Sequence, residues 1–497
     1  MDADKFMRRI YFPILLLVWL LVIIPGTALA HVGSRDVYEQ VKTGPYRLFI
    51  TVHVPSVVPG PATVAVQSSG AKADAIDISS ALMTSMANSA AAVTMSKTPD
   101  KPDNFTGNVW LSTAGSWEIR FTISGAEGKR TAVIPVAAVA ESNMTVERSL
   151  AFTLGLLALL LLIGTSGIAI AWRRDSRLAK DPVLARGLRL RSLGAGATAV
   201  IAVALLAWAG TVWWSNEANG YRPLGLNPVL EGNRLQLKVI AYSAGDKGAP
   251  SRSNDDFLPD DGHLMHLYMI RWPQMDAVFH LHPVRAAAGD FRVSLPTMPA
   301  GEYRLFGDIV HQNGFPETLV ANISVPADMP GGSPTADDAE GTAQPLSQGM
   351  LGDSFKLPDG YVMVWDRPAM VRANTAYAFR FRLLDPNGQP ATDMQPYLGM
   401  AGHAAFVKTD GSVFAHTHPE GSAAMAAVML ADKNNGNGMG MPMNMATHSG
   451  EMTMHSEPMS NVVEFPYGFP SSGRYRIFIQ MKHGTTVETG TFDVMVE

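Results

Sequence analysis

The chain has 497 residues, no cysteine and a formal net charge of −5. This length predicts several domains, because one hydrophobic core rarely serves more than about 250–300 residues. The lack of cysteine excludes disulfides, thiol nucleophiles, iron–sulfur clusters, and zinc or blue-copper sites that need a thiolate. The mildly negative charge favours no nucleic-acid partner. A content of 47% hydrophobic and 17% charged residues is typical of a membrane protein with sizeable soluble parts.

The N-terminus has the pattern of a secretory signal peptide. Residues 1–30 combine a basic start, an apolar stretch and a small-residue cleavage site, Ala28-Leu29-Ala30. The apolar stretch is also long enough for an uncleaved anchor, so cleavage stays open. Cleavage after Ala30 would make His31 the first residue. Its amino group and imidazole together form a minor candidate copper site.

Residues 31–145 are predicted to form an N-terminal β-sandwich. Short alternating runs such as "YRLFITVHV" and "WEIRFTIS" are separated by turns rich in Gly, Pro and Asn. This pattern is typical of a small antiparallel sandwich. His53 lies in the first of these runs and is interpreted as structural.

Residues 149–172 and 193–214 are predicted to be two transmembrane helices. Each contains an apolar run long enough to cross about 30 Å of hydrocarbon as a helix. The loop between them, 173–192, is rich in arginine, and short basic loops stay on the cytoplasmic side. This topology predicts the bacterial inner membrane as a partner, with the remaining domains on its periplasmic face.

The rest of the chain is predicted to form two further β modules, 215–325 and 350–497. The segment between them, 326–349, is rich in Pro, Gly, Ala and Asp and is interpreted as a linker. Strand-like runs open both modules. The predicted fold class is therefore mainly β, with three antiparallel, Ig-like β-sandwich modules and a two-helix transmembrane hairpin.

These two modules carry one motif twice, in the same order. Gly-His is followed by a strand, a turn, His-x-His-Pro, then Tyr-Arg-x-Phe and a terminal histidine. The matched pairs are His263 with His403, His280 with His416, His282 with His418, and His311 with His483. His266 has no counterpart in this alignment, where Phe406 stands opposite it. Glu317 and Glu488 occupy roughly matching places; they could be ligands or partners of the ligands, and the preferred interpretation is that they are surface acids.

The repeated histidines predict a metal site in each module. His-x-His on a strand places both imidazoles on one face, about 6.5–7 Å apart along the backbone. The following proline puts them at a strand end. Without thiolate, clustered imidazoles suit Cu(II), Zn(II) or Ni(II). We expect one ion per repeat, held by its four matched histidines, and whether the repeats act separately or jointly stays open. Alternatively, the histidines cap strand ends and duplication copied them.

The second module contains a methionine-rich insertion, 425–460, that the first lacks. Gly, Asn and Ser surround the methionines without a helical or strand periodicity. Thioether sulfur selects Cu(I), so the insertion favours copper over zinc, which remains the second choice. The alternative is a low-complexity loop without a metal. The auxiliary ligand candidates are Met439, Met441, Met443, Met445, His448, Met452, Met454 and His455.

Nearly the whole chain resembles a family of uncharacterised bacterial membrane-anchored exported proteins. "HVGSRDVYEQVKTGPYRLFITVHV" and "GSWEIRFTISG" look like its N-terminal sandwich, which is akin to YtkA-like and FixH-like domains. "GHLMHLYMI", "VFHLHP" and "VFAHTHP" look like its C-terminal modules. FixH-like proteins are associated with copper-dependent respiratory oxidases. The resemblance therefore implies copper, and a copper transporter or respiratory oxidase as partner.

The expected function is copper binding for buffering, delivery or resistance. An alternative is an assembly or interaction scaffold whose histidines are structural and bind no metal. A metal-dependent enzyme is disfavoured because no acid–base pair, nucleophile elbow or phosphate loop is recognisable. No catalytic residue is therefore predicted.

Overall fold

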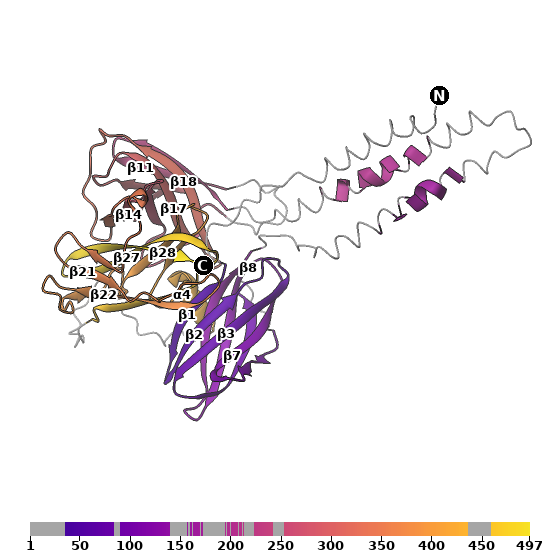
Figure 1. Cartoon of the computed structure of the whole chain (residues 1–497), viewed down its shortest axis with the longest axis horizontal. Helices are drawn as coiled ribbons and strands as arrows, with labels where there is room; N and C mark the ends of the chain where they lie inside the picture. The colour runs from indigo at the N-terminus through magenta and orange to yellow at the C-terminus, as the bar shows by residue number, and fades with distance from the viewer. Residues whose placement is uncertain are drawn as a thin grey trace, which may run out of the picture. The chain divides into compact units, whose positions relative to one another are not determined.

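The computed structural model describes residues 35–83, 90–139, 223–241, 253–435 and 459–497, together with scattered positions between 157 and 212. The described chain is mainly β, with several antiparallel sheets (Figure 1). This confirms the predicted fold class at that level. The described residues within 30–140 and 221–497 form one compact unit, which contains every strand of the described part of the chain.

Two sheets enclose the N-terminal core. The five-stranded sheet has the order β1 (Val37–Thr43), β2 (Tyr46–His53), β3 (Gly60–Gly70), β7 (Lys101–Leu111) and β6 (Ser96–Thr98). The four-stranded sheet has the order β5 (Val93–Thr94), β4 (Ala73–Leu82), β8 (Gly115–Gly125) and β9 (Arg130–Ala138). Alternate side chains from both sheets, such as Ile50, Val64 and Phe121, are buried in one core. Strand periodicity therefore sets which face is apolar.

The first repeat also consists of two sheets. One has the order β10 (Gly225–Glu231), β11 (Arg234–Ile240), β16 (Asp290–Ser294) and β15 (Val284–Ala287). The other has the order β12 (Phe257–Leu258), β17 (Gly301–His311), β13 (His266–Arg271), β14 (Ala277–Leu281) and β19 (Ala339–Thr342), and β18 (Pro316–Val325) also pairs with β17. The segment predicted as a linker thus supplies β19, which extends a sheet of this repeat.

The second repeat also has two sheets, and its histidine-bearing sheet follows the order of the first repeat up to β25. One sheet has the order β20 (Ser354–Lys356), β21 (Val362–Trp365), β22 (Tyr377–Leu384) and β26 (Val462–Tyr467). The other has the order β23 (Met394–Gln395), β27 (Gly473–His483), β24 (His403–Lys408) and β25 (Phe414–Thr417), and β28 (Thr486–Val496) also pairs with β27. Helix α4 (Met425–Asn434) follows β25, and the short 3₁₀ helix η2 (Leu346–Gln348) precedes β20.

The strand register corrects the alignment of the two repeats. His266 lies opposite Asp308 in the β13–β17 pair, and His403 lies opposite Gln480 in the β24–β27 pair. Asp308 and Gln480 each follow the repeated tyrosine by five residues. The structural counterpart of His403 is therefore His266 and not His263. The dipeptides Gly262-His263 and Gly402-His403 are identical in sequence, but their histidines do not occupy equivalent positions on the strands.

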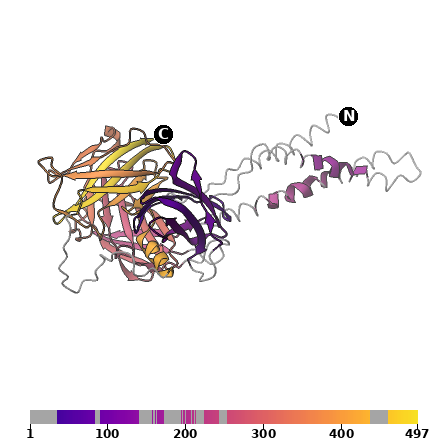
Figure 2. The ribbon, with the colours of Figure 1, turned by 90° about the horizontal axis from the view of Figure 1, so that it is seen from below.

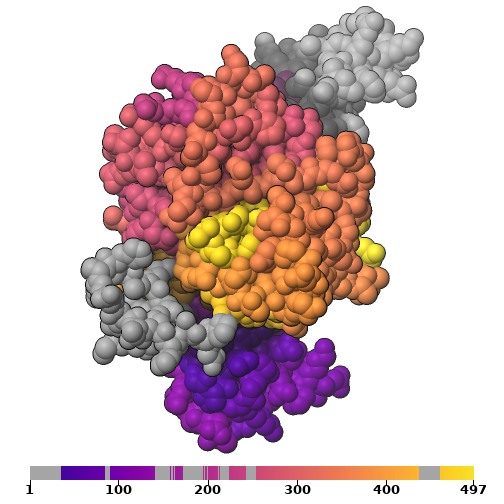
Figure 3. Space-filling model, turned by 90° about the vertical axis from the view of Figure 1, so that its left-hand side faces the viewer, coloured from indigo at the N-terminus to yellow at the C-terminus, as the bar shows by residue number. Residues whose placement is uncertain are grey.

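The two repeats share a buried interface. Strands β13 and β14 are buried along both faces, so their second face needs a partner. An apolar cluster that includes Phe306, Phe414 and Phe478 joins the repeats, and the rings of Phe306 and Phe414 stack with centroids 4.3 Å apart. Figure 3 shows the surfaces of the two repeats meeting without a gap. Nearby, the buried guanidinium of Arg476 pairs bidentately with Asp493.

The N-terminal sheets pack on the second repeat. Figure 2 shows α4 beside the N-terminal strands, and α4 contacts β9. The backbone N–H of Gln40 in β1 donates to the carbonyl of Glu420, and the buried carboxylate of Glu39 accepts from the N–H of Ala423 at 2.8 Å. The loop after β25 is therefore held by the N-terminal unit.

The predicted pair of membrane spans is contradicted. Between residues 157 and 212 only scattered helical positions are described. Among all described residues, no helix is long and apolar enough to cross a bilayer, which takes about 20 apolar residues. The predicted signal peptide 1–30 and basic loop 173–192 lie outside the described residues.

Candidate metal centre

Six histidines gather where the two repeats meet. His266 and His403 begin strands β13 and β24. His280 and His416 lie on the neighbouring strands β14 and β25, and the second histidine of each His-x-His pair follows at the strand end. We call His266, His280 and His282 triad 1, and His403, His416 and His418 triad 2. In each triad one nitrogen or other ligand atom per residue lies within 4.8 Å of the others.

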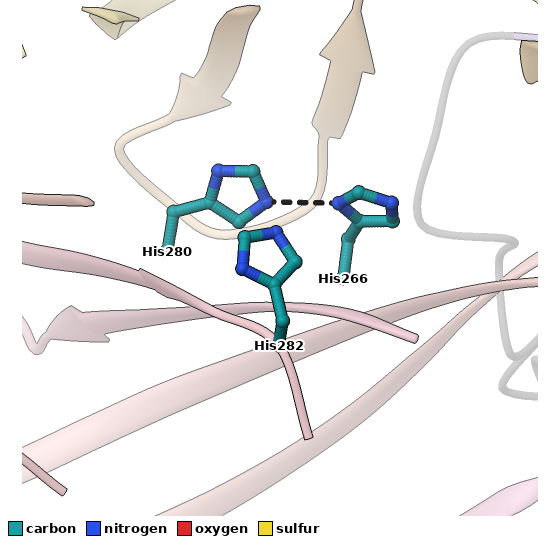
Figure 4. Close-up of side chains that lie close together, drawn as sticks. All are labelled: His266, His280 and His282. Carbon is teal, nitrogen blue, oxygen red and sulfur yellow. Dashed lines mark hydrogen bonds between the residues drawn. The ribbon is translucent and has the colours of Figure 1, made fainter. Parts of the chain in front are cut away.

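Triad 1 has two ring nitrogens in close contact. His266 Nδ1 lies 3.1 Å from His280 Nε2, and the ring of His282 lies beside both (Figure 4). Two nitrogens that bind one ion at about 2.0–2.1 Å in tetrahedral geometry lie about 3.3 Å apart. The spacing in triad 1 is close to that value.

The remaining nitrogens of triad 1 face oxygen acceptors. His266 Nε2 lies 2.9 Å from the carbonyl oxygen of Asp260, so it must carry the proton and donate. His280 Nδ1 lies 2.8 Å from Gln480 Oε1, which also accepts from the hydroxyl of Tyr268. With the amide oxygen of Gln480 on His280 Nδ1, and with both of these ring nitrogens protonated, the two nitrogens of the 3.1 Å contact both carry lone pairs. Such a contact is repulsive unless a cation lies between them.

His282, the third member of triad 1, also has one ring nitrogen that faces an oxygen acceptor and one that is free. His282 Nδ1 lies 3.3 Å from Asp338 Oδ1, and His282 Nε2 is buried with no hydrogen-bond partner. Asp338 lies just before β19, within the segment predicted as a linker. An acceptor on one ring nitrogen fixes the tautomer and raises the basicity of the other, as is usual for metal-binding histidine.

Triad 2 has a corresponding arrangement built mainly from carboxylates. Asp261 Oδ2 lies 3.5 Å from His403 Nε2 and 3.3 Å from His418 Nε2. Asp308 Oδ2 lies 3.5 Å from His416 Nδ1. The opposite nitrogens, His403 Nδ1, His416 Nε2 and His418 Nδ1, are buried without hydrogen-bond partners. His418 Nε2 has no hydrogen-bond partner either and faces Asp261 only at ion-pair distance. Each ring of triad 2 therefore has at least one nitrogen that no hydrogen bond occupies.

Burial keeps these imidazoles neutral. Desolvation, followed by the proximity of other histidines, holds the pKa of His266, His280, His403 and His416 well below the usual value. Neutral imidazole is the form that binds metal. Desolvation also raises the pKa of the neighbouring Asp261 and Asp308 carboxyls to about 7. A bound cation would favour the ionised form of both acids.

Two aromatic hydroxyl groups and a seventh histidine border the cluster. The ring of Tyr268 stacks on His280 with centroids 4.1 Å apart, and Tyr397 lies edge-on to His403. His263, which the sequence placed among the ligands, stacks on His282 at 4.1 Å while its Nε2 lies 3.4 Å from Asp337. It is half-buried, and we place it at the edge of the centre.

His311 and His483, also predicted as ligands, do not join the triads. Each lies three residues beyond the position opposite the triad, at Asp308 or Gln480, which is about 10 Å further along the strand and on its other face. His311 donates to Asp256 and Glu317 at 2.8 and 3.0 Å. The interpretation of Glu317 as a surface acid is therefore wrong, since its side chain is fully buried.

The end of β27 has a similar but more open group. His483 Nε2 lies 2.8 Å from Asp359, and its Nδ1 lies 3.2 Å from Asp393. Glu488 is buried as well, contrary to expectation, and desolvation followed by the charge of Asp359 raises the pKa of its carboxyl to about 7.

The other predicted ligands fall outside this centre. His31 and the auxiliary ligands Met439, Met441, Met443, Met445, His448, Met452, Met454 and His455 lie outside the described residues. His53 contacts Asp36 at 2.6 Å, which fits a structural role. The sequence analysis missed His266. It begins the buried strand "HLYMI", and aligning this run with "HAAFV" of the second repeat, in place of the two Gly-His dipeptides, pairs it with His403.

Comparisons with known proteins leave the identity of the chain open. Residues 356–497 match a family described as a domain of unknown function, DUF8832. No curated protein matches the chain. The solved structures with some similarity include a tetra-tandem repeat from the extending region of a large adhesion protein (8% identity, 89% of this chain and 72% of that one, TM-score 0.17). Another is a trypsin-activated α2-macroglobulin from Escherichia coli (8% identity, 95% and 24%, TM-score 0.17). Similarity this low supports no conclusion about the present chain.

Proposed function

We propose that this protein binds a transition metal, with copper as the first choice and zinc as the second, through the histidines at the junction of its two repeats. The observation that carries the proposal is the contact between His266 Nδ1 and His280 Nε2, two lone-pair nitrogens 3.1 Å apart in a buried site. A cation between them removes the repulsion and uses the nitrogen that each acceptor leaves free.

The ligand chemistry favours copper and zinc over harder ions. Imidazole suits zinc, copper, iron and nickel, whereas magnesium and calcium prefer oxygen. Copper(II) binds such sites more tightly than zinc in the usual order of affinities. The methionine-rich insertion adds thioethers that select Cu(I), so we propose that it collects copper for the buried centre.

The burial of the site favours retention of the metal over rapid transfer. Four of the six histidines are at most 2% exposed, His282 is 7% exposed, and the side chain of His416 is 5% exposed. A ligand set this enclosed must open locally before an ion can leave. We therefore propose a role in copper storage or resistance, on the extracytoplasmic side, with delivery as a slower process.

We further propose that the three two-sheet units are Ig-like β-sandwiches.

Elemental analysis of the full-length chain tests this function. The protein is stripped with a chelator, loaded with Cu(II) or Zn(II), and dialysed before its metal content is measured. We expect copper to be retained, and to be lost when His266→Ala and His403→Ala are combined. The control His53→Ala should keep it, because that ring lies outside the centre.

Failure to retain either metal in the unsubstituted protein would overturn the proposal and favour the scaffold alternative. A near-UV circular dichroism spectrum of each variant shows whether lost metal reflects lost ligands or lost packing. A variant that lacks residues 436–458 should reach the same final copper content but take up Cu(I) more slowly.

A further inference from the structure

The two triads lie against each other and not at separate edges of the repeats. Between the triads, ring centroids are 5.3 Å apart for His266 and His416, 5.4 Å for His280 and His416, 5.9 Å for His280 and His403, and 6.5 Å for His266 and His403. Within the triads the corresponding distances run from 4.6 Å for His280 and His282 to 5.3 Å for His403 and His416. The spacing across the junction therefore begins where the spacing inside each triad ends.

Each repeat orients histidines of the other. Gln480 of the second repeat accepts from His280 of the first, while Asp308 of the first repeat faces His416 of the second. Gln480 and Asp308 occupy equivalent register positions on β27 and β17. Each repeat thus supplies an oxygen that orients a histidine of the other, so neither triad is complete without the other repeat.

The available nitrogens follow the internal symmetry in two of the three histidine pairs. The free nitrogen is Nδ1 in both His266 and His403, which begin equivalent strands. It is Nε2 in both His280 and His416. The third pair differs, because His282 faces Asp338 through Nδ1 and leaves Nε2 free, whereas neither nitrogen of His418 has a hydrogen-bond partner. Each triad still provides three nitrogens for one ion.

Asp261 lies between the triads. Its carboxylate faces two histidines of triad 2, and one of its oxygens also lies within 4.8 Å of a ligand atom of His266 in triad 1. Asp261 Oδ1 is buried and has no hydrogen-bond partner. Asp261 also has a positive φ of 48°, a backbone conformation that costs energy in a residue other than glycine. A buried carboxylate in this place would reduce the repulsion between two nearby cations.

We propose that the junction holds a dinuclear centre, in which each triad binds one copper ion and the carboxylate of Asp261 lies between the two ions. Centres with two metals usually hold them about 3.5–4 Å apart, close enough to share a ligand. This inference rests on the proposed function, because it specifies how many ions the same histidines bind and how near they are. It also predicts that the two sites interact magnetically.

Electron paramagnetic resonance of the Cu(II)-loaded full-length protein tests the pairing. Total copper is measured by elemental analysis and compared with the spins counted by double integration of the spectrum. We expect about two copper ions per chain with far fewer than two spins, because neighbouring Cu(II) ions couple. The same measurement on the variant lacking residues 436–458 excludes copper held by the methionine-rich insertion.

Substitution of one triad supplies the internal control. His416→Ala and the milder His416→Gln should each retain about one copper per chain with a full single-spin signal, since the remaining ion has lost its neighbour. A dinuclear centre is ruled out by one copper in the unsubstituted protein, or by two coppers with two uncoupled spins, and both results would leave the proposed metal binding standing. Absence of any retained copper would overturn the proposed function as well.

Discussion

The triad histidines and His311 are similarly buried, but their nitrogens face different groups. Both nitrogens of His311 lie against carboxylates, those of Asp256 and Glu317. Burial lowers the pKa of His311, yet the hydrogen bonds to the two acids more than compensate, so its pKa is raised. His280 faces only neutral oxygens through its Nδ1, those of Gln480 and Tyr397, and its pKa is lowered by burial. Burial alone therefore does not make a metal ligand, because a ligand also needs a nitrogen that no protein group occupies.

Removal of one ligand from each triad should have the largest effect on metal binding. In the double variant His280→Ala, His416→Ala, each site keeps two imidazoles and loses a central ring. We expect the affinity for copper to fall at least tenfold. Loss of a residue that only hydrogen-bonds a ligand already weakens metal binding 10–100-fold, and here a ligand itself is lost. Isothermal titration of the metal-free protein measures this, and affinity equal to that of the unsubstituted protein would contradict the assignment.

Substitution of His311 should lower the stability of the fold and leave copper binding unchanged. His311→Ala removes the charged partner of the buried carboxylate of Glu317, which keeps its hydrogen bond from the N–H of Leu224. Loss of one member costs about 3–5 kcal/mol in comparable buried ion pairs. Copper content should not change. Chemical denaturation and elemental analysis measure the two quantities, with His311→Gln as the milder control. Loss of copper without loss of stability would place His311 among the ligands after all.

Substitution of the residues that orient the triad histidines should have an intermediate effect on the affinity for copper. Asp261→Asn keeps the shape of the side chain but removes a charge that faces His403 and His418. We expect the affinity for copper at triad 2 to fall 10–100-fold. The matched variant Gln480→Leu removes the acceptor of His280 and should weaken triad 1 instead. Competition with a chromogenic chelator measures both, and equal affinities in all three proteins would contradict this role.

Protonation of His311 should make a smaller contribution to the pH dependence of the free energy of unfolding. Its folded pKa is raised, so its stabilising contribution is fully present below the unfolded value of about 6.5 and is lost as the pH rises through the folded pKa. Denaturation midpoints of the metal-free protein, measured from pH 6 upward, should fall more steeply in the unsubstituted protein than in His311→Gln. Parallel curves would show that His311 is not held charged by its two acids.

Much of the fold was predictable because strand signals are local. Alternating runs such as "YRLFITVH" specify a strand and its buried face, and the internal repeat identified the His-x-His pairs on β14 and β25. The ligand set was only partly predictable. Matching the Gly-His dipeptides selected His263, whereas strand register selects His266. Register depends on pairing between distant strands, which a comparison of short motifs does not contain.

The packing of the two repeats against each other was even harder to predict from the sequence. The second buried face of β13 and β14 has the composition of any buried strand, so the sequence did not show that another module covers it. Asp261, Asp308 and Gln480 carry no motif of their own. Their roles arise because the repeats pack across the histidines and each supplies acceptors to the other.

X-ray absorption spectroscopy of the copper-loaded full-length protein tests most directly whether the triad histidines hold the metal through their unoccupied nitrogens. We predict a first shell dominated by imidazole nitrogen at about 2.0 Å, with about three such ligands per copper. The signal should disappear in the variant His280→Ala, His416→Ala and persist in His311→Gln. A first shell dominated by sulfur, or a spectrum unchanged by loss of both triad histidines, would contradict the account.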